Sequence, residues 1–287
     1  WKNGPWIRPA SLWLDAPPVG RGLRFVSSCL APAGRRSDRV LSTVFTGRYH
    51  FGPERPFLSA PVGATIRLGA AEVRLLPGGL GHGAAQLHFQ SDDGVLLYTV
   101  GCRLSGTALA APARFDAADV WVLRVDAAPG DGPPWLDWLD ALTETLRGGA
   151  VSSLRVAEPW LAVELAAGLS GRLDAAPGLD VTARRLVRWT RAEGPVPVGG
   201  GGPRIFLDAA AADAVVLAGD AGETSVPVPA APTLRELRAA AKTIGAREVL
   251  LVGAAAAPWA AALAGAGLPA RVLGESPRRL WWWRVHG

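Results

Sequence analysis

Four arginines and one tryptophan stand close together in the chain and have the chemistry to bind nucleic acid. Arg184, Arg185, Arg188 and Arg191 surround Trp189. Guanidinium groups pair with phosphates and an indole ring stacks on a base, so this combination suits a single strand of DNA or RNA. The alternative is an ordinary arginine-rich surface, because only two of the thirty basic residues are lysines.

A second group of basic and aromatic residues lies near the C-terminus. Arg278 and Arg279 precede three consecutive tryptophans, Trp281, Trp282 and Trp283. On a strand, alternate side chains face opposite sides, so Trp282 would point away from the other two. Large exposed aromatic side chains are typical of protein interfaces. This segment is therefore expected to contact a protein partner, or else to pack on its own domain as a final strand.

The sequence contains no recognisable catalytic motif of the common hydrolase or phosphate-binding types. Ser27, His50 and Asp15 are the residue types of a catalytic triad, but no nucleophile-elbow sequence surrounds the serine. His88 and His286 are isolated. The glycine run at 199–202 lacks the Gly-Lys-Ser/Thr ending of a phosphate-binding loop, so a linker is expected there.

The composition indicates a globular protein. With 287 residues, of which 49% are hydrophobic, the chain can bury a sizeable core in one large or two modest domains. A net charge of +5 permits an acidic or nucleic-acid partner without requiring one. Two cysteines are too few for a disulfide-rich scaffold, and no uninterrupted apolar stretch is long enough to span a membrane. We expect a cytoplasmic protein with no membrane contact and no cofactor.

The hydrophobic patterns differ between the two halves of the chain. Short strands bounded by Pro and Gly are predicted in the first half, at 11–15, 22–27, 39–45, 65–68 and 119–125. In the second half, predicted helices at 135–147, 159–169, 232–244 and 256–264 alternate with strands at 151–156, 204–207, 214–217, 248–252 and 270–273. This alternation indicates an α/β fold with parallel strands.

One segment resembles a known family. Residues 73–86 are Val-Arg-Leu-Leu-Pro-Gly-Gly-Leu-Gly-His-Gly-Ala-Ala-Gln, and 94–99 are Gly-Val-Leu-Leu-Tyr-Thr. They resemble the Pro-Ala-Gly-His-x-Leu-Gly-Ser-Ala-Gln…Tyr-Thr-Gly-Asp segment of metallo-β-lactamase-fold nucleases. The likeness is closest to the bacterial ligase-associated DNA exonucleases, which belong to the β-CASP group. Further segments match in the same order, namely 12–15, 25–27, 62–69 and 234–252.

The resemblance implies an architecture. The expected fold class is α/β, an αββα metallo-β-lactamase-like sandwich with a shortened β-CASP-like insertion. Residues 1–128 would form the first half of the sandwich, 129–224 the inserted domain and 225–287 the second half.

The same resemblance implies that the metal ligands have been lost. The family's His-x-His-x-Asp-His motif would follow Phe25-Val-Ser27, and its next His, its bridging Asp and its last His come later. An acidic position of the family falls near Arg124. The ligand positions are occupied here by Ser28, Leu30, Pro32, Ala33, Leu80, Gly101 and Gly253. None of these can replace the ligands that would activate water on two metal ions.

The resemblance therefore implies a pseudoenzyme, with no catalytic residues and no metal. We expect a scaffold or regulatory subunit of a DNA-repair or RNA-processing complex, whose partner would be an active nuclease paralogue, a helicase or a ligase. One alternative is a module that binds DNA or RNA in the old substrate groove without cutting. A third hypothesis rests on Cys29, Cys102 and His82, which the family fold would bring together as a single-metal site, a redox site or a disulfide. The alternative is that both cysteines are buried small hydrophobic residues, as most unpaired cysteines are.

Overall fold

The computed structural model describes residues 5–16, 22–32, 39–129, 132–148, 151–190, 202–207, 214–219, 222–229, 232–268 and 270–273. The chain forms two compact units. Unit 1 comprises Trp1–Leu104, Pro112–Asp131 and Ala231–Gly287, and unit 2 comprises Ser105–Ala111 and Gly132–Ala230. In sequence, unit 2 is therefore inserted between segments of unit 1.

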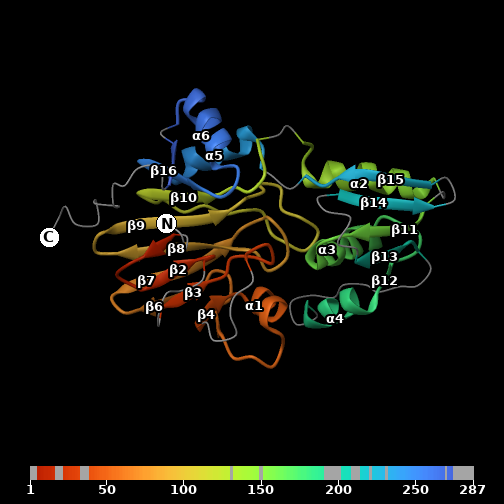
Figure 1. The fold of residues 1–287 in the computed structure, drawn as a ribbon, viewed down its shortest axis with the longest axis horizontal. Helices are drawn as coiled ribbons and strands as arrows, with labels where there is room; N and C mark the ends of the chain where they lie inside the picture. Colours follow the sequence, from red (N-terminus) through yellow and green to blue (C-terminus); the bar gives the residue numbers. More distant parts are fainter. Residues whose placement is uncertain are drawn as a thin grey trace. The chain divides into compact units, whose positions relative to one another are not determined.

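Unit 1 contains two β-sheets (Figure 1). The first has the strand order β1-β2-β3-β4-β5, with β1 antiparallel to β2 and the remaining pairs parallel. Its strands are β1 (Trp6–Ile7), β2 (Leu12–Leu14), β3 (Leu23–Phe25), β4 (Arg39–Ser42) and β5 (Leu58–Ser59).

The second sheet has the order β17-β16-β10-β9-β8-β7-β6. Strands β6 to β9 form an antiparallel meander, whereas β9, β10, β16 and β17 are parallel. The strands are β6 (Thr65–Leu68), β7 (Ala71–Pro77), β8 (Ala85–Ser91), β9 (Gly94–Val100), β10 (Val120–Arg124), β16 (Glu248–Val252) and β17 (Ala270–Val272).

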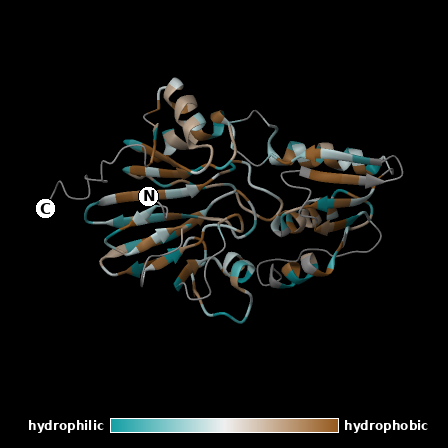
Figure 2. Cartoon of the chain, in the orientation of Figure 1, coloured by the Kyte–Doolittle hydropathy of each residue, from teal (hydrophilic) through white to brown (hydrophobic). Residues whose placement is uncertain are grey.

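Neighbouring residues of a strand point to opposite faces of the sheet, so consecutive buried residues in β8 and β10 show that the middle of the second sheet is buried on both faces. Tyr98 and Val122 belong to a cluster shared with the first sheet, where they pack with Phe25. Trp121 and Leu97 belong to a second cluster with residues of α5 (Leu234–Ile244) and α6 (Ala256–Gly265). Figure 1 shows these helices beside β10 and β16, and Figure 2 shows the hydrophobic residues along the strands. Each fully buried aliphatic side chain contributes about 1.5–3 kcal/mol.

Helix α1 (Val44–Phe51) lies where the sequence predicted the end of a strand. The β-branched and aromatic residues at 39–45 favour a strand, but β4 ends at Ser42. Thr43 caps the helix, since its side chain accepts a hydrogen bond from the Thr46 N–H at 3.3 Å. The Thr43 hydroxyl also donates to the Gly83 carbonyl at 2.7 Å. Local capping and this long-range bond outweigh the strand propensity.

Unit 2 contains one sheet of order β12-β13-β11-β14-β15. The strands are β11 (Val151–Val156), β12 (Gly178–Leu179), β13 (Arg204–Leu207), β14 (Ala214–Gly219) and β15 (Gly222–Pro227), and the helices are α2 (Trp135–Arg147), α3 (Pro159–Ser170) and α4 (Val181–Thr190). The predicted α/β class is confirmed. The prediction of parallel strands is wrong for β14, which is antiparallel to β11 and to β15. No strand was predicted at β15. Only two residues join β14 to β15, and a parallel pair needs a crossover of a dozen or more.

Among the described residues, none of the helices combines the length and the hydrophobicity that a membrane crossing requires. The longest described helix is α2, with 13 residues. It is amphipathic, with buried residues that include Trp138, Leu139 and Leu142 and an exposed Asp137.

A buried hydrogen-bond chain joins four strands of the second sheet of unit 1, β7 to β10. The Gln86 amide donates to the carbonyl oxygens of Pro77 at 2.7 Å and Arg114 at 2.8 Å. Its own oxygen accepts from the Thr99 hydroxyl at 2.6 Å, and that hydroxyl accepts from the Trp121 indole N–H at 2.9 Å. Because Gln86 is fully buried, water cannot replace these bonds if the amide is removed.

Replacement of this amide should destabilise the protein. Gln86→Leu leaves two carbonyls and one hydroxyl without their partner, so the free energy of unfolding should fall by about 2–4 kcal/mol in urea titrations. Gln90→Leu is the matched control, because Gln90 lies on the same strand but is exposed. A similar loss in both variants would contradict the role assigned to Gln86.

Candidate site at the carboxyl edge of unit 1

The carboxyl ends of parallel strands from both sheets meet at one edge of unit 1. Asp15 directly follows β2, and Arg124 ends β10. Both residues line the same pocket, as do Val252 at the end of β16 and Val272 at the end of β17. In α/β proteins, ligands bind preferentially at the carboxyl ends of parallel strands. This edge of unit 1 is therefore the candidate ligand-binding site.

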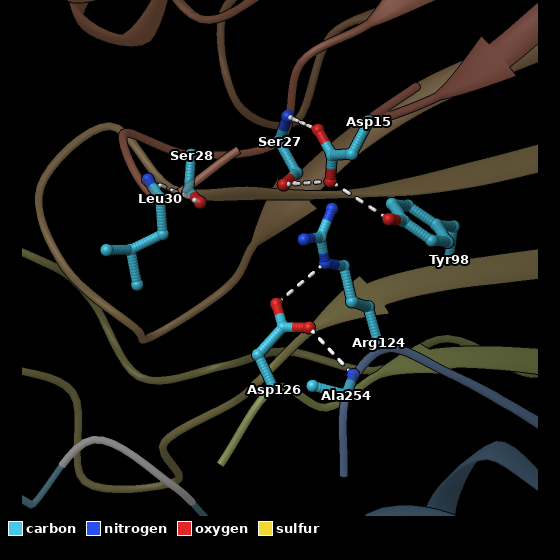
Figure 3. Close-up of polar contacts among 8 residues, drawn as sticks. All are labelled: Asp15, Ser27, Ser28, Leu30, Tyr98, Arg124, Asp126 and Ala254. Atoms are coloured by element: carbon cyan, nitrogen blue, oxygen red, sulfur yellow. Dashed lines mark hydrogen bonds and ion pairs between the residues drawn. The ribbon is translucent and has the colours of Figure 1, made fainter. Parts of the chain in front are cut away.

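Asp15 is a buried carboxyl group held by three hydrogen bonds. It accepts from the Ser27 N–H at 2.8 Å, from the Ser27 hydroxyl at 2.5 Å and from the Tyr98 hydroxyl at 2.9 Å (Figure 3). Burial raises its pKa, and the bonds from Ser27 and Tyr98 and the charge of Arg124 oppose that rise in part. Its φ of 47° is rare for a residue other than glycine. A backbone conformation of this kind persists only where contacts with the surrounding structure enforce it.

Arg124 is oriented by Asp126. Its Nε donates to Asp126 Oδ2 at 2.8 Å, and Asp126 Oδ1 accepts from the Ala254 N–H at 3.3 Å. Figure 3 shows the end of the guanidinium pointing toward Asp15. Burial lowers the pKa of Arg124, but Tyr98 and the two carboxylates outweigh burial and raise it. Arg124 therefore carries a fixed positive charge.

The pocket beside these groups has a volume of about 250 Å³. Asp15, Tyr98 and Arg124 are its ionisable lining residues. The remaining walls are mostly apolar and include Leu14 and Val252. The arrangement combines one guanidinium, a hydrogen-bonded carboxyl and a hydrophobic surface.

Two positions where the resemblance implied lost metal ligands lie next to each other. Leu80 is buried, and a Cβ placed on Gly101 would lie 3.3 Å from Leu80 Cδ1. Gly253 lies on the rim of the pocket, with φ of +109°. A Cβ there would come within 2.4 Å of the Val125 carbonyl oxygen. Position 253 therefore cannot carry a side chain in this backbone conformation.

The other implied ligand positions follow β3. The Ser28 side chain is buried and accepts from the Leu30 N–H at 3.3 Å, while Leu30 and Pro32 are exposed. His50 Nε2 lies 2.9 Å from the Ser28 carbonyl oxygen. Burial lowers the pKa of His50, so the ring is neutral and donates this bond. Ala33 lies outside the described residues.

The three residue types of a catalytic triad do not form one. The Ser27 hydroxyl bonds Asp15 directly, whereas His50 bonds the Ser28 carbonyl. A triad needs the histidine between the serine and the carboxylate. In this chain Ser27 acts as a donor that holds Asp15.

The structure also bears on the Cys29, Cys102 and His82 hypothesis. Among the described residues, no group of three or more His, Cys, Asp or Glu side chains could hold a metal ion, so these three do not form one. Both cysteines are buried and no disulfide joins them, which agrees with the alternative that they are buried small residues. Burial strongly raises the pKa of the Cys102 thiol and keeps it protonated. The His82 ring packs edge-on against Phe45, with ring centres 4.5 Å apart.

Three of the four arginines predicted to bind nucleic acid lie on α4. Arg184, Arg185 and Arg188 are exposed, whereas Leu186 and Val187 are buried. The three arginines lie on the exposed side of the helix, where Arg184 Nε also donates to the Leu179 carbonyl oxygen at 2.6 Å. Arg191 and the side chain of Trp189 lie outside the described residues, as do Arg278, Arg279, Trp281, Trp282 and Trp283.

The Asp15, Tyr98, Arg124 and Asp126 cluster was not predicted from the sequence. Asp15 and Tyr98 are 83 positions apart, and no local pattern pairs them. The sequence did contain one signal, because a charged residue stands at the carboxyl end of two of the strands. Asp15 follows β2, and Arg124 ends β10.

Comparison with known proteins gives a fold likeness alone. No family model matches the chain, and no curated protein matches it. A solved structure of a protein of unknown function from Enterococcus faecalis V583 is similar, with a TM-score of 0.56 and 11% identity. The match covers 80% of this chain and 75% of that one.

The titration of Asp15 should make stability depend on pH. Burial raises the pKa of Asp15 above its ordinary value of 3.8, so over part of the pH range the folded protein keeps a proton that the unfolded chain releases. The protonated Asp15 stabilises the folded state fully below about pH 4, and this stabilisation is lost as pH rises through the folded pKa. The free energy of unfolding of Asp15→Asn, measured by urea titration, should therefore increase relative to that of wild type as pH rises above about 4.

Asp92→Asn, in the exposed turn between β8 and β9, is the control and should show no such trend. If the free energies of unfolding of Asp15→Asn and wild type differ by the same amount at every pH tested above 4, the assigned upward shift of the Asp15 pKa is wrong.

Proposed function

We propose that this protein is a catalytically inactive relative of the metallo-β-lactamase-fold β-CASP nucleases, acting as a scaffold or regulatory subunit of a nucleic-acid-processing complex. The fold part of the proposal is supported by the layers of unit 1. Two sheets share one core, α5 and α6 cover the outer face of the second sheet, and α1 lies beside the first. The place of unit 2 in the sequence is also what an inserted domain requires.

The contact between Leu80 and Gly101 is the observation that carries the proposal. In the family these two positions hold a histidine and a bridging aspartate, which must be close together to share metal ions. Here the same positions are neighbours, and the methyl groups of Leu80 lie beside Gly101. This proximity supports the likeness to the nuclease family. Leucine and glycine side chains cannot bind metal ions, so the residue types argue against metal-dependent cleavage.

The remaining ligand positions support the same conclusion. Two-metal hydrolysis needs several imidazole and carboxylate ligands converging on one point. Ser28 is committed to a loop hydrogen bond, Leu30 and Pro32 are exposed, and Gly253 has no room for a Cβ. A scaffold needs only the fold and a surface for its partner.

The proposal predicts a stable partner and no cleavage. Tagged protein purified from its native host should recover a nuclease, helicase or ligase in stoichiometric amount, measured by quantitative mass spectrometry against a tag-only control. The isolated protein should leave labelled DNA and RNA intact when Mn²⁺ or Zn²⁺ is added. Recovery of the protein alone, or metal-dependent cleavage, would contradict the proposal.

The exposed arginines of α4 favour a second candidate, a module that binds nucleic acid without cutting it. Arg184 and Arg188 are one helical turn apart, and Arg185 lies beside them on the exposed side. Three guanidinium groups on one helix face can contact successive phosphates of a strand.

Removal of these arginines tests the second candidate. Replacement of Arg184, Arg185 and Arg188 by Ala should weaken binding of a single-stranded oligonucleotide, and should reduce the slope of log K against log salt by about 2. Fluorescence anisotropy at several salt concentrations measures both effects. Replacement of the exposed Arg235, Arg238 and Lys242 on α5 is the control, because it removes the same charge. Equal effects of the two triple variants would rule out a specific site on α4.

A further inference from the structure

The pocket at the carboxyl edge of unit 1 contains a basic group whose chemistry the scaffold proposal does not use. Within the described part of the chain, the Arg124 side chain makes its hydrogen bond through Nε, which donates to Asp126. Its two terminal nitrogens point toward Asp15 along the pocket lining (Figure 3). A guanidinium presents pairs of parallel N–H donors, and a carboxylate is the group that matches them.

The two acidic residues beside Arg124 are already occupied by other donors. Asp126 accepts from Arg124 and from the Ala254 N–H. Asp15 accepts three hydrogen bonds, and burial disfavours its negative charge. Neither carboxyl group is bonded to the terminal nitrogens of Arg124 in the described residues, so these nitrogens are available to an outside acceptor.

The size and walls of the pocket define the rest of the ligand. Leu14, Val252, Val272 and Leu273 give it an apolar surface. Its volume of about 250 Å³ is below the range of drug-sized sites. This volume suits a compact molecule with one charged end and a short hydrocarbon body.

We propose that this pocket binds a small aliphatic carboxylic acid, whose carboxylate pairs with Arg124 and whose hydrocarbon part contacts Leu14, Val252 and Val272. This proposal does not depend on the scaffold function, because it concerns the isolated protein. It adds a small-molecule site to unit 1 and gives Arg124 a direct role as a ligand-binding residue.

Calorimetric titration with 3-methylbutanoate tests the proposal on the full chain. Saturable binding at one site is expected, with Kd of about 1 mM or lower. The uncharged 3-methylbutanamide has nearly the same shape and should bind at least about tenfold more weakly, because it cannot form the charged pair. Inorganic phosphate should also bind more weakly, because it has no hydrocarbon part to contact the apolar walls.

Three variants locate the site. Arg124→Met should weaken binding of the acid at least about tenfold by removing the charge. Val272→Phe should do the same by filling the pocket while Arg124 stays in place, which keeps the test decisive if the first variant fails to fold. Arg67→Met is the control, since Arg67 is an exposed arginine paired with Glu72 on other strands of unit 1. It should bind like wild type.

Four results would overturn the proposal. These are no binding of the acid to wild type, equal binding of the amide, stronger binding of phosphate than of the acid, or unchanged binding in Val272→Phe. None of them bears on the recovery of a partner from the native host, so failure of this proposal and failure of the scaffold proposal are distinguishable.

Discussion

The buried carboxyl group of Asp15 joins the two sheets of unit 1 at the edge where their parallel strands end. Its hydrogen bonds reach Ser27 in the first sheet's connecting segment and Tyr98 on a strand of the second sheet. Hydrogen bonds to a charged group contribute about 1.5–3 kcal/mol each, and burial of the charge opposes them. These bonds link the end of β2 to β9 in the other sheet. The pocket forms around this link, because Asp15, Tyr98 and Arg124 line it together.

Much of the secondary structure could be predicted from the sequence, because hydrophobic periodicity is a local property. Helix α2 was predicted with its observed bounds, and β16 likewise. The prediction failed at residue 43, where a capping threonine begins α1 inside a sequence with strand propensity. Part of that cap's environment, the Gly83 carbonyl, lies 40 residues away. A local pattern does not contain this information.

The candidate site was predictable only in part. The resemblance of residues 73–99 to the nuclease segment relates Leu80 to Gly101, and a Cβ placed on Gly101 would lie 3.3 Å from Leu80 Cδ1. The Asp15 and Arg124 cluster was missed because its members come from strands of different sheets. Their types are common at strand ends, and only the packing of the two sheets decides which of them meet.

The backbone at Gly253 also has an evolutionary consequence. The positive φ and the nearby Val125 carbonyl exclude every other residue at this position unless the main chain moves. In any relative that keeps this turn after β16, position 253 should therefore be glycine. A different residue there should occur only together with a rearranged main chain around Val125, so variation at the two positions should be linked.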